Sequence, residues 1–329
     1  MKVAIIGAGG RARSAHYPVL ASLTSEISLE AVCDLDPERL ATVADAYDIP
    51  RRYTDYRQML DEVDCDIVYA IMQPFHVCSV AIDALNAGKH VMVEKPPGAS
   101  SSETARIAEA ATRNSRLACV ALQRRWTPLL REARRRVEEK GPIRFVLAGM
   151  NKHPSMQTPD SLRINVMYDR DIHMIDFIRW ICGGDWDEVL TLGDNAYTDW
   201  TNGYQSIIRF VSGAVGVHTA IGHAGNRYYR IEMHGNGISA YLRPPTYGEV
   251  FSHAGTDPEV LDAPSLTGDA NGHLDDGVEA LHRDFVMCVR EGREPLTNIH
   301  DVLCSMQLLE RIGSLDPRGQ PLEDGITMA

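Results

Sequence analysis

The chain opens with a short apolar strand that runs directly into a glycine-rich turn. Residues 2–6 are followed by Gly7-Ala8-Gly9-Gly10-Arg11-Ala12, the G-x-G-x-x-A form of a dinucleotide-binding fingerprint. Gly7 permits the tight turn, Gly9 lets a pyrophosphate approach the main chain, and Ala12 still allows close packing of helix on strand. A helix is expected over residues 11–23, and its first amides would face the phosphates. This opening predicts a parallel sheet with a helix after each strand.

A second strand, expected at residues 29–33, ends at Asp34. An acidic group about twenty residues beyond the turn meets the adenosine ribose in folds of this kind. Its carboxylate would accept hydrogen bonds from both ribose hydroxyls and repel a 2′-phosphate. We therefore expect NAD as the cofactor, while nearby arginines keep NADP open. Asp36, followed by a proline, is expected to cap the next helix.

Two kinds of pattern divide the chain. Up to residue 122 helix and strand alternate, which predicts an α/β class Rossmann domain, 1–122, with a doubly wound parallel sheet. Beyond it, closely spaced strand candidates predict an α/β domain, 123–329, with an open and largely antiparallel sheet. The expected strands of that sheet include residues 204–210, 214–220, 229–233 and 237–242. Helices are expected at 124–140, 171–182, 277–291 and 298–312.

Composition narrows the class of protein. A length of 329 residues suits two domains, and a formal net charge of −12 argues against nucleic acid as a partner. The sequence contains no apolar run long enough for a membrane span. Seven scattered cysteines without C-x-x-C spacing predict reduced thiols and no metal site. A cytoplasmic location is expected.

The segment at residues 91–97 places a lysine at the end of an apolar strand. Residues 91–93 read as strand, and Pro96 holds Lys95 in an extended conformation, with a Lys-Pro bond that could also be cis. A cation aimed in this way could reach a reacting oxygen. The simpler alternative is a solvated strand end, which would be preferred for an isolated Glu-Lys-Pro.

A helix in the second domain carries three polar side chains on one face. Asp169, His173 and Asp176 are spaced by four and three residues. Taken singly, they could be a helix cap, a hydrogen-bonded imidazole and a surface carboxylate. With Lys95 they suit oxidation of a secondary alcohol, which needs a base of intermediate pKa and a cation for the developing alkoxide. An imidazole, with an unperturbed pKa of about 6.5, suits the first need, and an ammonium suits the second.

These motifs together resemble the Gfo/Idh/MocA family of nicotinamide-dependent oxidoreductases. The resemblance rests on the fingerprint, Asp34, Glu94-Lys95-Pro96, and Asp169 with His173. It implies hydride transfer on sugars, cyclitols or their derivatives, with Lys95, Asp169 and His173 catalytic and with Glu94 and Lys95 beside the cofactor. It also implies a homo-oligomer, dimeric or tetrameric, formed through the second sheet. We expect His173 to be the base and Lys95 the polarising cation.

Two departures from the family pattern affect the expected contacts. Gln73 and Phe75 stand where many relatives have T-P-N-x-x-H, so they become the candidates for the nicotinamide side. Asp171 replaces the usual glycine between the aspartate and the histidine, and its charge is expected to favour a neutral or cationic substrate. The weaker candidates for substrate contacts are polar or aromatic side chains of the second domain, for each of which a structural role is equally compatible: His153, Arg163, Asp176 and Tyr229.

Two other functions stay open at this point. A redox-assisted glycosidase or lyase would oxidise C3 of a sugar transiently, with the same base and cation, and would retain its cofactor. A non-catalytic nucleotide sensor is the less favoured alternative, because fold alone does not fix function. A sensor would have no need of Lys95, Asp169 and His173 together.

Overall fold

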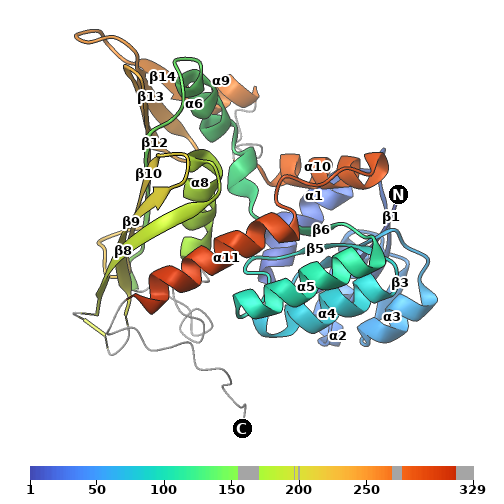
Figure 1. Ribbon diagram of the computed structural model, residues 1–329. Helices are drawn as coiled ribbons and strands as arrows, with labels where there is room; N and C mark the ends of the chain where they lie inside the picture. The colour runs from blue at the N-terminus through green and yellow to red at the C-terminus, as the bar shows by residue number, and fades with distance from the viewer. Residues whose placement is uncertain (155–169, 196, 199–200, 269–275, 316–329) are drawn as a thin grey trace. The chain divides into compact units, whose positions relative to one another are not determined.

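The computed structural model describes residues 1–154, 170–195, 197–198, 201–268 and 276–315. The chain divides into two compact units, and each is built around one sheet (Figure 1). The first unit comprises Met1–Gln123 and Gly277–Leu303. The second comprises the described residues of Arg124–Asp276 and of Cys304–Ala329, so the division falls within the last helix.

The first unit contains a six-stranded sheet in which every neighbouring pair is parallel. This confirms the predicted Rossmann arrangement. In sheet order its strands are β3 (Arg51–Tyr53), β2 (Ser28–Cys33), β1 (Lys2–Ile6), β4 (Ile67–Ala70), β5 (His90–Val93) and β6 (Ala118–Val120). The central strands are buried on both faces, as expected for a parallel sheet covered by helices.

Helices cover both faces of this sheet. In Figure 1, α4 and α5 lie together on one face, and α1 and α10 lie on the other. The helices that this unit contributes are α1 (Tyr17–Ser22), α2 (Pro37–Ala46), α3 (Tyr56–Glu62), α4 (Pro74–Asn86), α5 (Ser101–Asn114), α10 (Val278–Glu291) and the start of α11 (Ile299–Ser314). Asp36 caps α2 through the backbone N–H groups of Glu38 and Arg39, as its sequence predicts.

The first unit includes a segment from far along the chain. A contiguous division at residue 122 assigns residues 277–303 to the second domain, yet α10 packs beside α1 in the first unit. Helix α10 belongs to the first unit because it has an apolar and aromatic face that packs there. The rings of His282 and Phe285 lie 5.2 and 6.2 Å from the ring of Tyr69 on β4, measured between centroids.

The second unit contains an eight-stranded sheet that is antiparallel except for the pairing of β7 with β10. It confirms the predicted open, largely antiparallel sheet. In order its strands are β14 (Glu259–Asp262), β13 (Tyr247–Phe251), β12 (Ile238–Arg243), β11 (Tyr228–Gly235), β7 (Phe145–Asn151), β10 (Val215–Ile221), β9 (Gly203–Phe210) and β8 (Trp186–Asp194).

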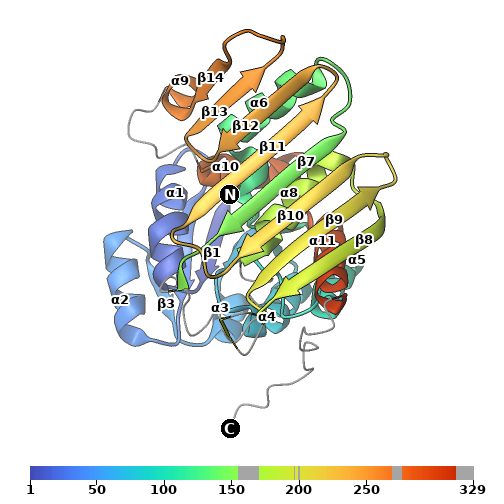
Figure 2. The same cartoon turned by 90° about the vertical axis from the view of Figure 1, so that its left-hand side faces the viewer.

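Helices cover one face of the second sheet. They are α6 (Pro128–Glu138) and α8 (Ile172–Cys182), with the short α9 (Ala263–Thr267) following β14. The opposite face, turned towards the viewer in Figure 2, carries no helix among the described residues of this unit. Leucine and isoleucine side chains on this face are exposed: 61% for Leu190, 73% for Leu192 and 50% for Ile207.

The structure differs from the sequence pattern in local details. The helix expected at residue 11 begins with a π-helical turn, Ala12–His16, in which the N–H of Tyr17 donates to the carbonyl of Ala12. Strands β8, β13 and β14 were not expected, because their apolar residues do not alternate cleanly between the two faces.

In the part of the chain that the structure describes, every helix is too short or too polar to cross a bilayer.

Candidate active site

The glycine turn lies at the carboxyl end of β1, and its geometry requires glycine at the first position. Gly7 has φ +114°, and a Cβ added there would lie 2.0 Å from the carbonyl oxygen of Ile71. At Gly9 and Gly10 an added Cβ would meet no atom within 4 Å. The main chain of these two residues therefore borders open space that side chains would fill. This is the cradle that a pyrophosphate needs in order to approach backbone amides closely.

Asp34 ties this turn to the end of the second strand. Its Oδ2 accepts a hydrogen bond from the backbone N–H of Ala8 at 2.6 Å, and its Oδ1 accepts one from Asp36 at 2.9 Å. Each oxygen of an ionised carboxylate can accept more than one hydrogen bond. The half-buried Asp34 side chain is therefore oriented by the backbone and still has acceptor capacity for ribose hydroxyls.

Lys95 follows β5, at the same carboxyl edge of the sheet as the glycine turn. The Lys95–Pro96 peptide bond is cis, one of the two forms that the sequence permits. Gln73 precedes α4 at the end of the β4 connection, and Phe75 in its first turn is 46% exposed. Ligands of open parallel sheets bind at this edge. The structure thus brings the fingerprint, Asp34, Gln73, Phe75 and Lys95 to one edge of one sheet.

Glu94 is buried beside Lys95 and is held by hydrogen bonds from three donors. Its Oε1 lies 2.8 Å from Nε2 of His16 and 2.7 Å from Nε of Arg11, and its Oε2 accepts the backbone N–H of Lys95 at 2.9 Å. Burial would raise the pKa of Glu94, but the hydrogen bond from His16 and the neighbouring positive charges outweigh it and hold the pKa well below its usual range. Through these contacts Glu94 connects Arg11 of the fingerprint with the backbone of Lys95.

In the second unit, His173 lies in the first turn of α8 and is 8% exposed. Asp169 and Arg163 lie outside the described residues. Asp171 precedes the helix and accepts two hydrogen bonds from Arg170, at 2.8 and 3.0 Å, while Nε2 of His218 lies 3.9 Å away.

The charge of Asp171 is compensated within the protein. Burial would raise its pKa, but the charge of Arg170 and the neighbouring His218 lower the pKa overall. The side chain is fully buried. The expectation that Asp171 adds a negative charge for a cationic substrate therefore loses its electrostatic basis, because a bidentate arginine satisfies the carboxylate.

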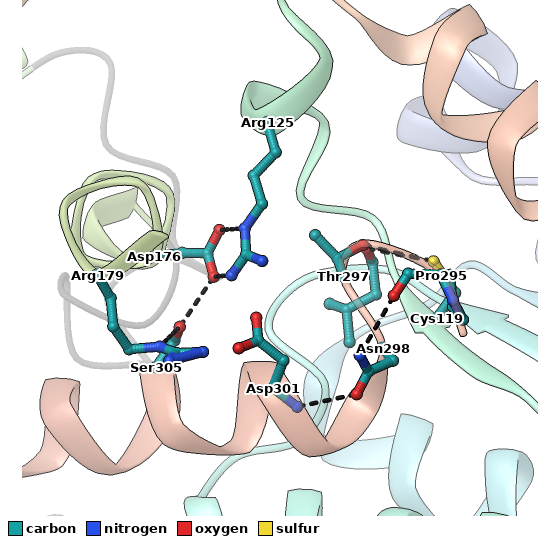
Figure 3. A network of polar contacts seen from close by, with 10 residues as sticks. Cys119, Arg125, Asp176, Arg179, Pro295, Thr297, Asn298, Asp301 and Ser305 are labelled. Carbon is teal, nitrogen blue, oxygen red and sulfur yellow. Dashed lines mark hydrogen bonds and ion pairs between the residues drawn. The ribbon is translucent and has the colours of Figure 1, made fainter. Parts of the chain in front are cut away.

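Asp176 is also occupied by protein partners (Figure 3). Nε and Nη2 of Arg125 donate to its two carboxylate oxygens at 2.9 and 2.5 Å, and the hydroxyl of Ser305 donates to Oδ1 at 2.8 Å. Arg179 donates to the Ser305 hydroxyl at 3.0 Å. With 1% exposure, Asp176 has the environment of a buried structural ion pair, which favours the structural alternative over substrate binding.

Tyr229, a candidate for substrate contact, has two arginine side chains stacked on its ring. It lies on β11, and the guanidinium carbons of Arg124 and Arg227 are each 4.8 Å from its ring centroid. Nη1 of Arg124 also donates to Asp276 at 2.9 Å. His153 lies exposed just beyond the end of β7. The two arginines around Tyr229 were not singled out in the sequence, because neither lies in a spacing motif with it.

Comparison with known proteins agrees with the fold and with the nucleotide turn. Residues 1–122 match the model of the oxidoreductase family with an NAD-binding Rossmann fold. The first domain of this chain is therefore an NAD-binding Rossmann domain similar to that of this oxidoreductase family. The family that this model describes is Gfo/Idh/MocA, and the match covers the first 122 residues of the chain.

Relatives by sequence include inositol 2-dehydrogenase of Salmonella typhimurium, 28% identical over 192 residues, which are 57% of this chain and 56% of that one. Levoglucosan dehydrogenase of Pseudarthrobacter phenanthrenivorans is 25% identical over 71% of each chain. This chain thus spans little more than half the length of the inositol 2-dehydrogenases that it matches. Among solved structures, a dehydrogenase from Chromobacterium violaceum has the same fold, with a TM-score of 0.86, 20% identity and coverage of 96% and 95% of the two chains.

Proposed function

We propose that this protein is an NAD-dependent dehydrogenase that transfers a hydride between a secondary alcohol of a sugar, cyclitol or sugar derivative and nicotinamide. The observation that carries the proposal is the shared edge of the first sheet, where the phosphate cradle, Asp34 and Lys95 lie together. The substrate class is supported by relatives that act on inositol and levoglucosan. Hydride acceptance is the chemistry that bound NAD⁺ supplies.

In this proposal three residues act on the reacting alcohol or on its base: Lys95, Asp169 and His173. His173 takes the proton of the substrate hydroxyl as the carbinol carbon loses its hydride, and the alcohol becomes a ketone. The ammonium of Lys95 stabilises the negative charge that develops on the oxygen. Asp169 orients His173 and stabilises its protonated form. The reverse reaction returns the proton from His173 to the alkoxide oxygen.

The remaining contacts are assigned by position. The backbone amides at Gly9, Gly10 and Arg11, with Ala12 packed below, would hold the pyrophosphate, and Gln73 and Phe75 would contact the nicotinamide side. We propose that Tyr229 contacts the substrate, together with His153 and Arg163. Asp176 supports the helix that carries His173, through its pair with Arg125.

A panel of polyols and glycosides, screened for absorbance of reduced cofactor, tests this function. We expect stoichiometric accumulation of NADH with at least one cyclitol or pyranose and none without it. Cleavage of a glycoside without net NADH would instead identify a redox-assisted glycosidase or lyase. Tight NAD binding with no turnover of any compound would point to a nucleotide sensor.

Asp34 is expected to determine the preference for NAD over NADP. Asp34→Ala removes the acceptor for the ribose hydroxyls and also the repulsion of a 2′-phosphate. We expect NAD binding to weaken about 10-fold or more, as loss of a charge-assisted hydrogen bond predicts, while NADP binding changes little. Fluorescence titration with each reduced cofactor measures both constants. Equal weakening for the two cofactors would refute the ribose assignment. The matched control is Asp36→Ala, which removes the cap of α2 and the ion pair of Asp36 with Arg39.

We also propose that the helix-free face of the second sheet joins two copies of the chain. One apolar row crosses four neighbouring strands on this face. Its members are paired from strand to strand: Leu190 of β8, Ile207 of β9, Val217 of β10 and Leu147 of β7. Exposed apolar rows of this kind mark interaction surfaces.

A charge in the middle of this row should prevent association. We expect Ile207→Glu to reduce the mass found by light scattering from that of an oligomer to that of a single chain. Met287→Glu, which places the same charge at an exposed position of α10, serves as control. A wild-type protein that is already monomeric, or an oligomer that survives Ile207→Glu, would contradict the proposal.

A further inference from the structure

Lys95 has an unusual support for its main chain. The sheet ladder ends at Glu94, whose N–H donates to the carbonyl of Ala70 at 3.1 Å. The next amide, that of Lys95, donates to the side chain of Glu94 instead of to a neighbouring strand. The orientation of the peptide plane that carries Lys95 is therefore linked to the position of one carboxylate.

That carboxylate is in turn held from inside the domain. His16 is 1% exposed and contacts Glu94 through Nε2 at 2.8 Å. Its other ring nitrogen, Nδ1, lies 3.1 Å from Nε2 of His282, which is fully buried on α10. Because the Glu94 carboxylate only accepts hydrogen bonds, Nε2 of His16 is the donor in that contact, and the contact between the two histidines needs a proton on either Nδ1 of His16 or Nε2 of His282. The contacts define a linear chain from Glu94 through His16 to His282.

The chain ends inside the protein. The His282 ring packs edge-on against His16 and lies against the ring of Tyr69. Burial and the charge of His16 hold the pKa of His282 well below its usual value, so this ring stays neutral. An arrangement that ends on a neutral, enclosed imidazole is suited to fixing a geometry rather than to carrying protons to water.

The same carboxylate holds the cofactor turn. Arg11, next to Gly10, donates from Nε to the oxygen that His16 also contacts, and its side chain is 42% exposed. Glu94 thus joins two parts of the proposed site: the arginine beside the phosphate cradle and the backbone of the lysine. A buried carboxylate is retained at a cost in desolvation, and three donors satisfy it here.

We propose that Glu94, held by the His16–His282 pair, is a positioning residue that aligns Lys95 with the reacting oxygen, an inference that rests on the proposed function of Lys95. The chain acts through the Lys95 peptide and does not touch the substrate. Because a displacement of about 1 Å in a catalytic group can lower the rate about 100-fold, loss of this support should lower turnover without removing the cofactor.

The test compares four variants of the full-length protein with Lys95→Ala. Glu94→Gln keeps the shape but replaces one acceptor by a donor, so at least one of the three contacts is lost. His16→Leu removes the support altogether, whereas His16→Gln keeps an amide that can donate to Glu94. His90→Gln is the matched control, because Nδ1 of His90 also accepts a partly buried hydrogen bond, at 3.0 Å from the Leu117 amide, but His90 lies at the opposite end of β5.

We expect Glu94→Gln and His16→Leu to lower kcat about 100-fold, with KM for the alcohol and Kd for NADH within a few fold of wild type. His16→Gln should recover much of the loss, and His90→Gln should leave kcat unchanged. Melting temperatures report folding, and the isosteric Glu94→Gln keeps the test decisive if His16→Leu does not fold.

Two results would overturn the positioning role while leaving the function of Lys95 intact. One is near-normal kcat for Glu94→Gln when Lys95→Ala is inactive. The other is a loss of NADH binding that parallels the loss of kcat, which would mean a structural role for the cluster. Activity in Lys95→Ala would remove both proposals at once, since no lysine would then need to be positioned.

Discussion

Replacing Lys95 by alanine is expected to lower kcat by about 1,000-fold or more, because a preorganised donor for a developing oxyanion is among the largest single contributions to catalysis. The charge is needed mainly as the alkoxide forms, so NADH binding should stay within a few fold of wild type. Stopped-flow measurement of NADH formation and a fluorescence titration provide the two values.

A second lysine gives the control for this experiment. Lys89 lies just before β5, at the strand end opposite to Lys95. Lys89→Ala should therefore change neither kcat nor NADH binding. Lys95→Arg keeps the charge but not the compact ammonium, so we expect only partial recovery. Near-normal turnover in Lys95→Ala would refute the role of the lysine.

Replacing His173 by asparagine is expected to lower kcat about 100- to 10,000-fold, the range for loss of a general base. Asparagine keeps hydrogen-bonding capacity at a similar position but cannot accept the proton at neutral pH. The residual rate should rise with pH, because hydroxide then removes the alcohol proton in place of the imidazole. A pH series of initial rates with saturating polyol measures this.

The histidine control comes from the same domain. His234 on β11 hydrogen-bonds Ser239 at 2.8 Å, and His234→Asn should leave both rate and pH profile unchanged. A small loss of kcat in His173→Asn with an unaltered pH profile would exclude His173 as the base. If Lys95→Ala alone then showed the pH-dependent residual rate, the lysine would be the base instead.

The fold was largely predictable, because its strongest signals are local. The apolar strand before Gly7 and the alternation of helix and strand up to residue 122 specify a parallel sheet, and the closely spaced strands specify the second one. The return of α10 to the first unit was not predictable. It depends on the fit of His282 and Phe285 against Tyr69, which lies more than 200 residues earlier in the chain.

The candidate site was predictable to a similar extent. The fingerprint, Asp34 and Lys95 fall at one sheet edge because the carboxyl ends of parallel strands meet there. The partners of the predicted carboxylates were missed. His16 with Glu94 and Arg125 with Asp176 are pairs of residues separated by 78 and 51 positions. Residue spacing encodes neighbours on one helix face, but not contacts that arise only when distant elements pack.

The most direct test is a crystal structure of the complex with NADH and a bound polyol or ketone product. The proposal predicts that Nζ of Lys95 and a ring nitrogen of His173 both lie within about 3.2 Å of the same substrate oxygen, the reach of a hydrogen bond. The carbon bearing that oxygen should face the nicotinamide. A complex in which the two groups contact different atoms, or in which either one points away from the bound substrate, would contradict the proposed mechanism.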